Sequence, residues 1–235
     1  PQPHENSSAA SDVYKRQGED AESNRPAYDN IIQGISGLMS LTGSNHKEPI
    51  KSGVPISDLS TGMFAIIGIL TALRNKEATG KGEKIDISML DCQASLLNYI
   101  ATMHLISGKD PEPIGNEHPV HTPFNSYKTA DGFIILSVVH EDFWPNLVQA
   151  LNLKDLDIEK YESATGRSKD RAKIDSTLEE IFITNTTEHW LKILNEHRVP
   201  CGPVNKLSEV FNDPDLIKRD MICLLYTSPS PRDLV

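Results

Sequence analysis

The stretch Gly53–Ile67, which reads GVPISDLSTGMFAII, decides how the first half of the chain folds. Apolar residues continue beyond it on most sides of a helical projection, so we predict a buried helix over about Asp58–Lys76. Asp58 stands at the expected helix start, where a capping carboxylate accepts backbone N–H groups and contributes about 1 kcal/mol.

A second interpretation of Asp58 is chemical. The free N–H groups and positive dipole of a helix start would hold the carboxylate ionised. A partly buried carboxylate beside such donors can act as a nucleophile. Ser60, Thr61 and Gly62 follow, and these small residues would let a substrate approach. The local pattern alone leaves capping and catalysis both open.

The segments on either side predict an α/β domain. Ile31, Ile32, Ile35 and Leu38 recur at helical spacing, which predicts a helix over Tyr28–Leu41. Residues 84–89, KIDISM, alternate as a strand does, and Asp91–Ile106 has helical character. Helix, strand and helix joined by short loops are typical of a layered α/β fold.

The second half has a different pattern. Residues 108–123, GKDPEPIGNEHPVHTP, read as a connector rich in Pro, Gly and His. Residues 124–139 predict a hairpin that turns at Asp131-Gly132. Helices are expected from Glu141, near 170–183 and over 187–197, with Thr187 as an N-cap. We therefore expect a small α+β domain.

Composition excludes some partners. The 235 residues carry a net charge of -10 and a pI near 5.2, which argues against nucleic acid and anionic membranes as partners. No apolar run approaches the roughly 18 residues that span a bilayer. Three scattered cysteines form neither a disulfide framework nor a metal spacing. A cytoplasmic protein is expected.

Both ends of the chain look foreign to it. Residues 7–17, SSAASDVYKRQ, and residues 223–233, CLLYTSPSPRD, back-translate into a common transposase-based sequencing adapter. We interpret them as non-native and the remainder as a gene fragment, which we expect to be unstable or inactive by itself. The expected divisions are a non-native or disordered 1–17, a large-domain portion 18–110 containing Asp58, a linker and small domain 111–204, a return segment 205–222 and a non-native tail 223–235.

Four ordered blocks resemble one family. They lie at 25–43, RPAYDNIIQGISGLMSLTG; at 53–91, beginning GVPISDLSTG; at 127–138, YKTADGFIILSV; and at 198–216, RVPCGPVNKLSEVFNDPDL. They are similar to the class III coenzyme A transferases, the family of formyl-CoA transferase and carnitine-CoA transferase. The resemblance implies an α/β fold with a partial Rossmann-like large domain and a small α+β domain, in an interlocked homodimer.

The resemblance also implies a mechanism. The family's nucleophilic aspartate falls at Asp58, which would attack an acyl-CoA thioester and pass coenzyme A to a carboxylic acid through a covalent aspartyl intermediate. Coenzyme A enters as a co-substrate, and no permanently bound cofactor or metal is implied.

Ala27, Tyr28 and Asp29 are implied to lie beside coenzyme A. The same superfamily contains α-methylacyl-CoA racemases, which carry a proton-transferring histidine where Tyr28 stands. Tyrosine, with a pKa near 10, is a poor proton shuttle at neutral pH, so Tyr28 favours the transferase. A racemase and a non-catalytic CoA-binding relative remain the alternatives.

Histidines in the connector are candidate substrate residues. His118 and His121, in HPVH, would need a third ligand at a sensible spacing to hold a metal, and the sequence offers none. Some transferases cover the acyl group with a glycine-rich lid, which this chain lacks. Gly115–Pro123 is the expected substitute, with Gly115, His118 and His121 near the substrate.

Overall fold

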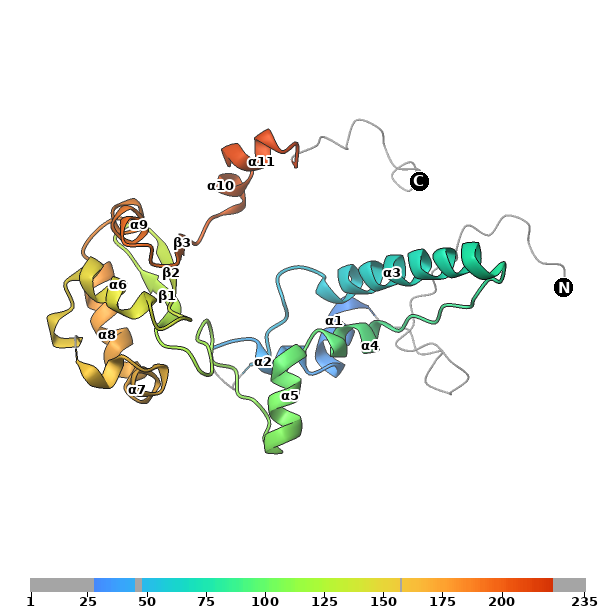
Figure 1. Ribbon diagram of the computed structural model, residues 1–235, viewed down its shortest axis with the longest axis horizontal. Coiled ribbons are helices and arrows are strands. Elements are labelled where there is room, and N and C mark those ends of the chain that lie inside the picture. Colours follow the sequence, from blue (N-terminus) through green and yellow to red (C-terminus); the bar gives the residue numbers. More distant parts are fainter. Residues whose placement is uncertain (1–27, 45–47, 157, 222–235) are drawn as a thin grey trace. The chain divides into compact units, whose positions relative to one another are not determined.

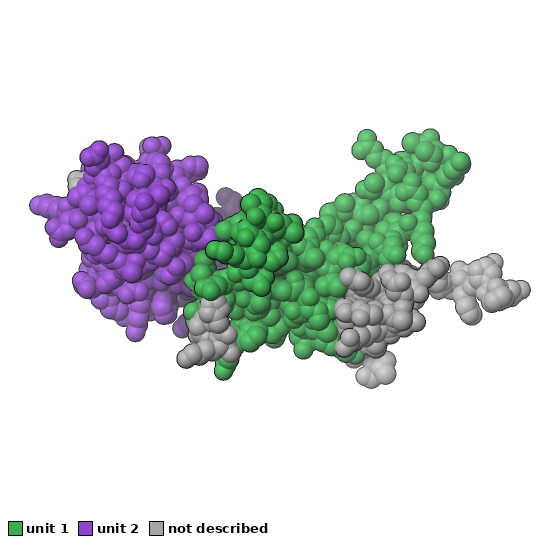
Figure 2. Space-filling view, turned by 90° about the horizontal axis from the view of Figure 1, so that it is seen from below, with its two compact units in different colours: residues 1–115 green, residues 116–235 purple. Residues whose placement is uncertain are grey.

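The computed structural model describes residues 28–44, 48–156 and 158–221. The chain divides into two compact units, residues 1–115 and residues 116–235, which Figure 2 shows in different colours. The sequence predicts this division between residues 110 and 111, and the structure has it after Gly115. We call the two parts unit 1 and unit 2, and each is described by itself.

The described part of unit 1 is helical (Figure 1). The predicted helix over Tyr28–Leu41 is broken at Gly37, whose φ of 87° is left-handed and interrupts the helix. The predicted helix over Asp91–Ile106 is likewise two helices. The helices are α1 (Asp29–Ile35), α2 (Leu38–Leu41), α3 (Ile56–Thr79), α4 (Met89–Ser95) and α5 (Asn98–Ser107).

The predicted strand at residues 84–89 is wrong. A strand needs neighbouring backbone to pair its N–H and C=O groups, and none of the described segments of unit 1 pairs with these residues. Ile85 and Ile87 pack instead on α3: a Cβ at Gly68 would lie 3.1 Å from Ile85 Cγ2 and 3.9 Å from Ile87 Cδ1. The alternating apolar residues of this segment therefore pack on helix α3 instead of forming one face of a strand.

Helix α3 begins earlier and ends later than predicted. It ends at Gly80, whose φ is 72° and whose N–H donates to Lys76 O over 2.8 Å. By length and composition it is also a helix that could cross a membrane, the one such helix among the described residues. The prediction that it is buried is wrong for this chain, because its large apolar side chains are exposed: Leu59, Met63, Ile66, Ile67, Ile69, Leu70 and Leu73.

Unit 2 contains an antiparallel sheet in the order β1-β2-β3. The predicted hairpin is confirmed as β1 (Phe124–Lys128) and β2 (Phe133–Ser137), and β3 (Cys201–Pro203) pairs with β2. The helices are α6 (Phe143–Leu151), α7 (Ala164–Lys169), α8 (Arg171–Phe182), α9 (Thr187–Glu196), α10 (Leu207–Val210) and α11 (Pro214–Lys218), with 3-10 turns at Lys154–Leu156 and Glu159–Tyr161.

Helix α9 begins at Thr187, where the sequence predicts it, but its N-cap differs by one residue from the prediction. Thr186, not Thr187, is the N-cap, and its hydroxyl accepts the N–H of His189 over 3.3 Å. Thr187 donates its N–H and its hydroxyl to Asp131 Oδ1, over 2.8 and 2.9 Å. These bonds hold the pKa of Asp131 below its usual range. The hairpin turn is thereby tied to α9.

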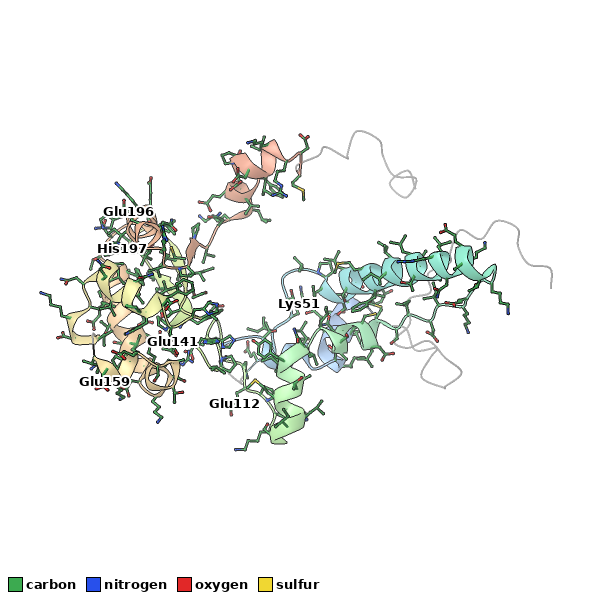
Figure 3. The ribbon with its side chains drawn as sticks, viewed as in Figure 1. Lys51, Glu112, Glu141, Glu159, Glu196 and His197 are labelled. Atoms are coloured by element: carbon green, nitrogen blue, oxygen red, sulfur yellow. The ribbon has the colours of Figure 1, made fainter. Side chains whose placement is uncertain are left out.

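A buried arginine joins the connector to the core of unit 2. The Arg167 side chain is fully buried and donates to the carbonyls of Thr122, Tyr161 and Glu162 over 2.7 to 3.0 Å. It also donates to Glu141 Oε2 over 2.7 Å, and Glu141 is labelled in Figure 3. Sequence reasoning did not single out Arg167, because arginine is seldom fully buried.

Candidate functional site around Asp58

Asp58 lies in the first turn of α3 but is not its N-cap. The N-cap is Pro55, and the helix begins at Ile56, whose N–H donates to Val54 O over 2.8 Å. The capping interpretation of Asp58 is therefore wrong, because the helix starts before it. The Asp58 side chain is exposed and makes no hydrogen bond to any residue that the structure describes.

Asp29 satisfies the start of α3 from another helix. It is the first residue of α1, which packs against α3 (Figure 1). Its Oδ1 accepts the Ser57 N–H over 2.9 Å. The first N–H groups of a helix have no partner within the helix, so this carboxylate does the work of a side-chain cap. Asp29 thus fixes the residue next to Asp58.

Gln33 holds Asp29 in place. Its Nε2 donates to Asp29 Oδ2 over 2.7 Å, and its Oε1 accepts the Ser52 N–H over 2.8 Å. The Gln33 side chain has no exposed surface. One amide therefore connects α1 to the loop that leads into α3.

Helix α4 holds the same turn from its other side. The Ser57 hydroxyl donates to Gln93 Oε1 over 2.9 Å, and both residues are buried. Ser57 O accepts the hydroxyls of Ser60 and Thr61, over 3.1 and 2.6 Å. Ser60 is fully buried, so it does not open the surface to a substrate as expected. Gly62 does, since nothing lies within 4 Å of where its Cβ would be.

The pKa of Asp58 is raised above its ordinary value. Partial burial of the carboxyl, in a side chain that is exposed as a whole, is the larger cause, and the negative charge of Asp29 is the smaller. Both effects disfavour the charged form. The direction is opposite to the one expected from the helix start. An ionised Asp58 is accordingly a more basic, and so a more nucleophilic, carboxylate than an ordinary aspartate.

The other predicted coenzyme A residues lie at the start of α1. Tyr28 is the N-cap of α1 and its side chain is 70% exposed, while its carbonyl accepts the N–H groups of Ile31 and Ile32. Ala27 lies outside the described residues. The structure thus brings Asp29 and Asp58 to one turn, while contact with coenzyme A stays a prediction for Ala27, Tyr28 and Asp29.

The three predicted substrate residues fall in different units. Gly115 closes unit 1, with a φ of 67° and its N–H donating to Gly43 O over 2.7 Å. His118 and His121 belong to unit 2, with ring centroids 4.6 Å apart. Their role toward substrate stays a prediction.

The His118–His121 segment is tied to α8. His118 Nδ1 accepts the N–H groups of Val120 and His121 over 3.1 and 3.2 Å. Arg171 donates to the carbonyls of His118 and His121 over 2.7 and 3.2 Å. Burial, then His121 and Arg171, lower the pKa of His118. The described residues include no group of three side chains able to hold a metal ion.

Asp58 does not line the cavity that the described helices of unit 1 form between α2 and α5. A hollow of about 310 Å³ lies between α2 and α5, lined mostly by apolar side chains such as Leu41 and Ile100. Neither Asp29 nor Asp58 lines it. Among the described residues, the Asp58 side chain is exposed, and the Ser57 that precedes it is hydrogen-bonded on both sides.

Sequence reasoning missed Gln33, Ser57 and Gln93. One readable signal existed: Asp29 and Gln33 are four residues apart, a spacing at which helical side chains meet. The partners Ser52, Ser57 and Gln93 are distant in sequence, and no local pattern joins them.

Comparison with known proteins identifies relatives along most of the chain. The family described as CoA-transferase family III matches residues 9–230. The succinate–glutarate CoA-transferase of Agrobacterium fabrum is 35% identical over 200 residues, 83% of this chain and 49% of that protein. The human succinyl-CoA:glutarate CoA-transferase is 32% identical over 201 residues, 85% of this chain and 46% of that protein. The acetyl-CoA:oxalate CoA-transferase of Acetobacter aceti is 31% identical over 199 residues, 84% of this chain and 51% of that protein.

A solved structure shares the fold. The crystal structure of a CAIB/BAIF family protein from Brucella suis matches with a TM-score of 0.76 and 32% identity, over 89% of this chain and 55% of that one. The chain spans about half the length of the relatives it matches.

Proposed function

Because the chain belongs to CoA-transferase family III, we propose that it carries the nucleophile of an enzyme that moves coenzyme A from an acyl-CoA thioester to a carboxylic acid. The observation that supports this most directly is the contrast within one turn. Ser57 is bonded on both sides, while the neighbouring Asp58 carboxylate is exposed and makes no hydrogen bond to a described residue. A carboxylate of raised pKa on a fixed turn suits nucleophilic attack.

The first half of the reaction makes Asp58 an acyl carrier. An oxygen of the ionised Asp58 attacks the thioester carbonyl, the C–S bond breaks, and a mixed anhydride and the CoA thiolate form. The thiolate then attacks the Asp58 acyl carbon. The C–O bond of the anhydride breaks, the donor acid leaves as its carboxylate, and Asp58 becomes an aspartyl-CoA thioester.

The second half runs the same steps in reverse. The acceptor carboxylate attacks the aspartyl thioester, which releases the CoA thiolate and forms a second anhydride. The thiolate attacks the acceptor's acyl carbon, so a new acyl-CoA leaves and Asp58 returns as a carboxylate. No proton is gained or lost, and the thioester energy passes from one acid to the other.

Other residues take supporting roles in this proposal. Asp29 holds Ser57 and places its negative charge near Asp58, which raises the basicity of the nucleophile. Ala27, Tyr28 and Asp29 contact coenzyme A, and His118 and His121 contact the acyl group. The full-length enzyme has a Rossmann-like large domain, acts as an interlocked homodimer and is cytoplasmic.

Dicarboxylic acids are the proposed substrates. The relatives are named for succinyl-CoA or succinate with glutarate, and for acetyl-CoA with oxalate. Every acceptor in these names has two carboxyl groups, one of which can be activated while the other is recognised. We propose a short dicarboxylate as the acceptor here.

The test is covalent trapping in the full-length protein. Succinyl-CoA is added, then hydroxylamine, which converts an aspartyl thioester into a hydroxamate that mass spectrometry locates. We expect the hydroxamate at Asp58, and we expect Asp58→Ala to remove both the adduct and CoA exchange. Asp86→Asn is the matched control, since Asp86 is an exposed aspartate of the same unit.

Two results would contradict the proposal. One is CoA exchange that persists in Asp58→Ala. The other is loss of α-deuterium from a branched acyl-CoA without any trapped adduct, which would indicate the racemase reaction instead.

A further inference from the structure

The mechanism leaves two buried amides of unit 1 without a role. Gln33 has no exposed surface and Gln93 is 1% exposed. Placing an amide in an interior without hydrogen bonds costs free energy, so buried amides have partners. Both amides here bond to the residues that surround Asp58, and neither contacts the Asp58 carboxylate itself.

The bonds form one continuous chain. It runs from the Ser52 N–H to Gln33, from Gln33 to Asp29, from Asp29 to the Ser57 N–H, and from the Ser57 hydroxyl to Gln93 (the buried network). The bonds measure 2.7 to 2.9 Å. The buried network therefore links three helices and one loop, and it passes through Ser57, the residue that precedes Asp58.

Each amide in the network has a required orientation. Gln33 Nε2 must face the Asp29 carboxylate, since a carboxylate only accepts, and Gln33 Oε1 must face the Ser52 N–H, which only donates. A glutamate has the shape of glutamine but no N–H to donate. Replacing Gln33 by glutamate would therefore remove the hydrogen bond to Asp29 without changing the shape of the side chain.

We propose that Gln33 and Gln93 are positioning residues for Asp58: through Asp29 and Ser57 they fix the first turn of α3, so that the Asp58 carboxylate is held in its attacking position. This inference rests on the proposed function. An error of about 1 Å in the position of a reacting group can lower a rate by about a hundredfold. Asp58 has no hydrogen bond of its own to a described residue, so the backbone of its turn sets its position.

The decisive variant is Gln33→Glu in the full-length protein. Its second carboxylate would face Asp29 where Nε2 now donates, and two carboxylates so close share a proton at low pH and repel each other when both ionise. We expect kcat to fall at least about tenfold at pH 8 while KM for acyl-CoA changes little. At about pH 5 the shared proton restores the bond, so the ratio of variant to wild-type rate rises.

The pH dependence of this rate ratio is read against the other titratable groups near Gln33. The titratable groups on the elements packed around Gln33 are Asp29 on α1, Asp58, Arg74, Lys76 and Glu77 on α3, Asp91 and Cys92 on α4, and Glu48 and Lys51 on the loop. Lys51, labelled in Figure 3, donates to Ser52 O over 3.2 Å. Measuring wild type at each pH accounts for the part of the Asp58 titration that does not depend on residue 33.

Two further variants separate positioning from folding. Gln93→Glu keeps an oxygen for the Ser57 hydroxyl and is expected to retain most activity, whereas Gln93→Leu removes it and is expected to lower kcat as Gln33→Glu does. Gln149→Glu makes the same change at an exposed position of α6 and is expected to have no effect. Circular dichroism of each variant checks that the fold is retained.

The outcomes distinguish this inference from the proposed function. If wild type traps no adduct at Asp58, the proposed function is wrong. If wild type traps the adduct and Gln33→Glu traps it at the wild-type rate from pH 5 to pH 8, the positioning role is wrong. A Gln33→Glu protein that is unfolded throughout that range also overturns the inference, because the network would then be a requirement of folding.

Discussion

Unit 2 is stabilised by a closed apolar core and unit 1 by hydrogen bonds at one turn. In unit 2, Leu136, Leu147, Leu178 and Leu194 have no exposed surface and belong to one buried cluster. In the described part of unit 1, the buried apolar cluster consists of Ile32 and Met89. The apolar side chains of α3 lie on the outside instead.

The difference matters because the two kinds of contact have different strengths. Burying a large apolar side chain stabilises a fold by about 1.5–3 kcal/mol. An ordinary hydrogen bond contributes about 0.5–1.5 kcal/mol net, because the unfolded chain bonds to water. The buried network can define the shape of the Asp58 turn, but it cannot replace a core. In the described part of unit 1, hydrogen bonds therefore define the geometry of the site, while the small apolar core contributes little to stability.

Separating the two units tests this contrast most directly. We expect a polypeptide of residues 116–221 to fold by itself and to unfold in one cooperative transition, because its core is complete. We expect residues 28–115 to show helical circular dichroism without a cooperative thermal transition. Both tryptophans of the chain, Trp144 and Trp190, lie in unit 2 and give its unfolding a fluorescence signal.

The contrast fails if residues 28–115 melt cooperatively as a monomer. The contrast is sharpened if residues 28–115 melt cooperatively only as part of a chain as long as the relatives. The added residues would then supply the apolar contacts that unit 1 does not make by itself.

Replacing Arg167 by methionine is the largest single change expected within unit 2. The carbonyls of Thr122, Tyr161 and Glu162 would lose their donor, and each buried polar group left unsatisfied costs about 1–3 kcal/mol. Urea unfolding followed by tryptophan fluorescence measures the loss. Lys173→Met, an exposed change on α8, is the control and should stay within about 0.5 kcal/mol.

One substitution made in both units compares them directly. Leu194→Ala empties a position with no exposed surface and should lower the free energy of unfolding by about 2–5 kcal/mol. Leu70→Ala removes a side chain that is 62% exposed and should change it by less than about 0.5 kcal/mol. Circular dichroism melts of the 235-residue chain report both. Equal losses would show that α3 is covered after all.

The sequence predicted the parts of the fold that depend on local pattern. The turn at Asp131-Gly132 and the alternating residues beside it were enough to predict the hairpin of unit 2. The strand at residues 84–89 was wrong because Ile85 and Ile87 alternate against a helix, and alternation does not reveal what lies opposite. The predicted helix at residues 28–41 is interrupted because Gly37 takes a positive φ, and the neighbouring residues in the sequence did not indicate this conformation.

The site was half predictable for a similar reason. Asp58 was singled out as a candidate from the motif around it, and Asp29 from the resemblance. Their direct relation was not, because the bond from Ser57 to Asp29 joins residues 28 positions apart. The pKa of Asp58 was expected to shift the other way, since the sequence showed the helix start but neither the partial burial of the carboxyl nor the charge of Asp29 beside it.

A smaller effect than that of Leu194→Ala concerns a polar contact that the core of unit 2 encloses. Tyr127 donates its hydroxyl to Asp175 Oδ1 over 2.5 Å, and both are buried. Burial and Asp175 raise the pKa of Tyr127 far above its usual range, so the hydroxyl stays a donor. Burial raises the pKa of Asp175, while the bond from Tyr127 and the charge of Arg171 oppose that rise.

Tyr127→Phe should therefore destabilise unit 2 in a pH-dependent way. Because the folded pKa of Asp175 lies above the unfolded one, its contribution to stability is fully present at low pH and is lost as pH rises through the folded pKa. Removing the hydroxyl raises that pKa further. The loss should thus be about 1–3 kcal/mol at neutral pH and should shrink below about pH 4, where Asp175 is protonated in both states.

Tyr161→Phe is the matched control for this last effect. The Tyr161 hydroxyl donates to Asp170 over 2.8 Å, but Asp170 also bonds to Lys160 and remains partly exposed, so it keeps a partner when the hydroxyl is gone. Urea unfolding at several pH values should show a pH-dependent loss for Tyr127→Phe and a smaller, flatter one for Tyr161→Phe. Equal losses of unfolding free energy for the two variants at every pH would contradict this prediction. Burial in the core of unit 2 would then not be what determines the strength of the Tyr127–Asp175 hydrogen bond.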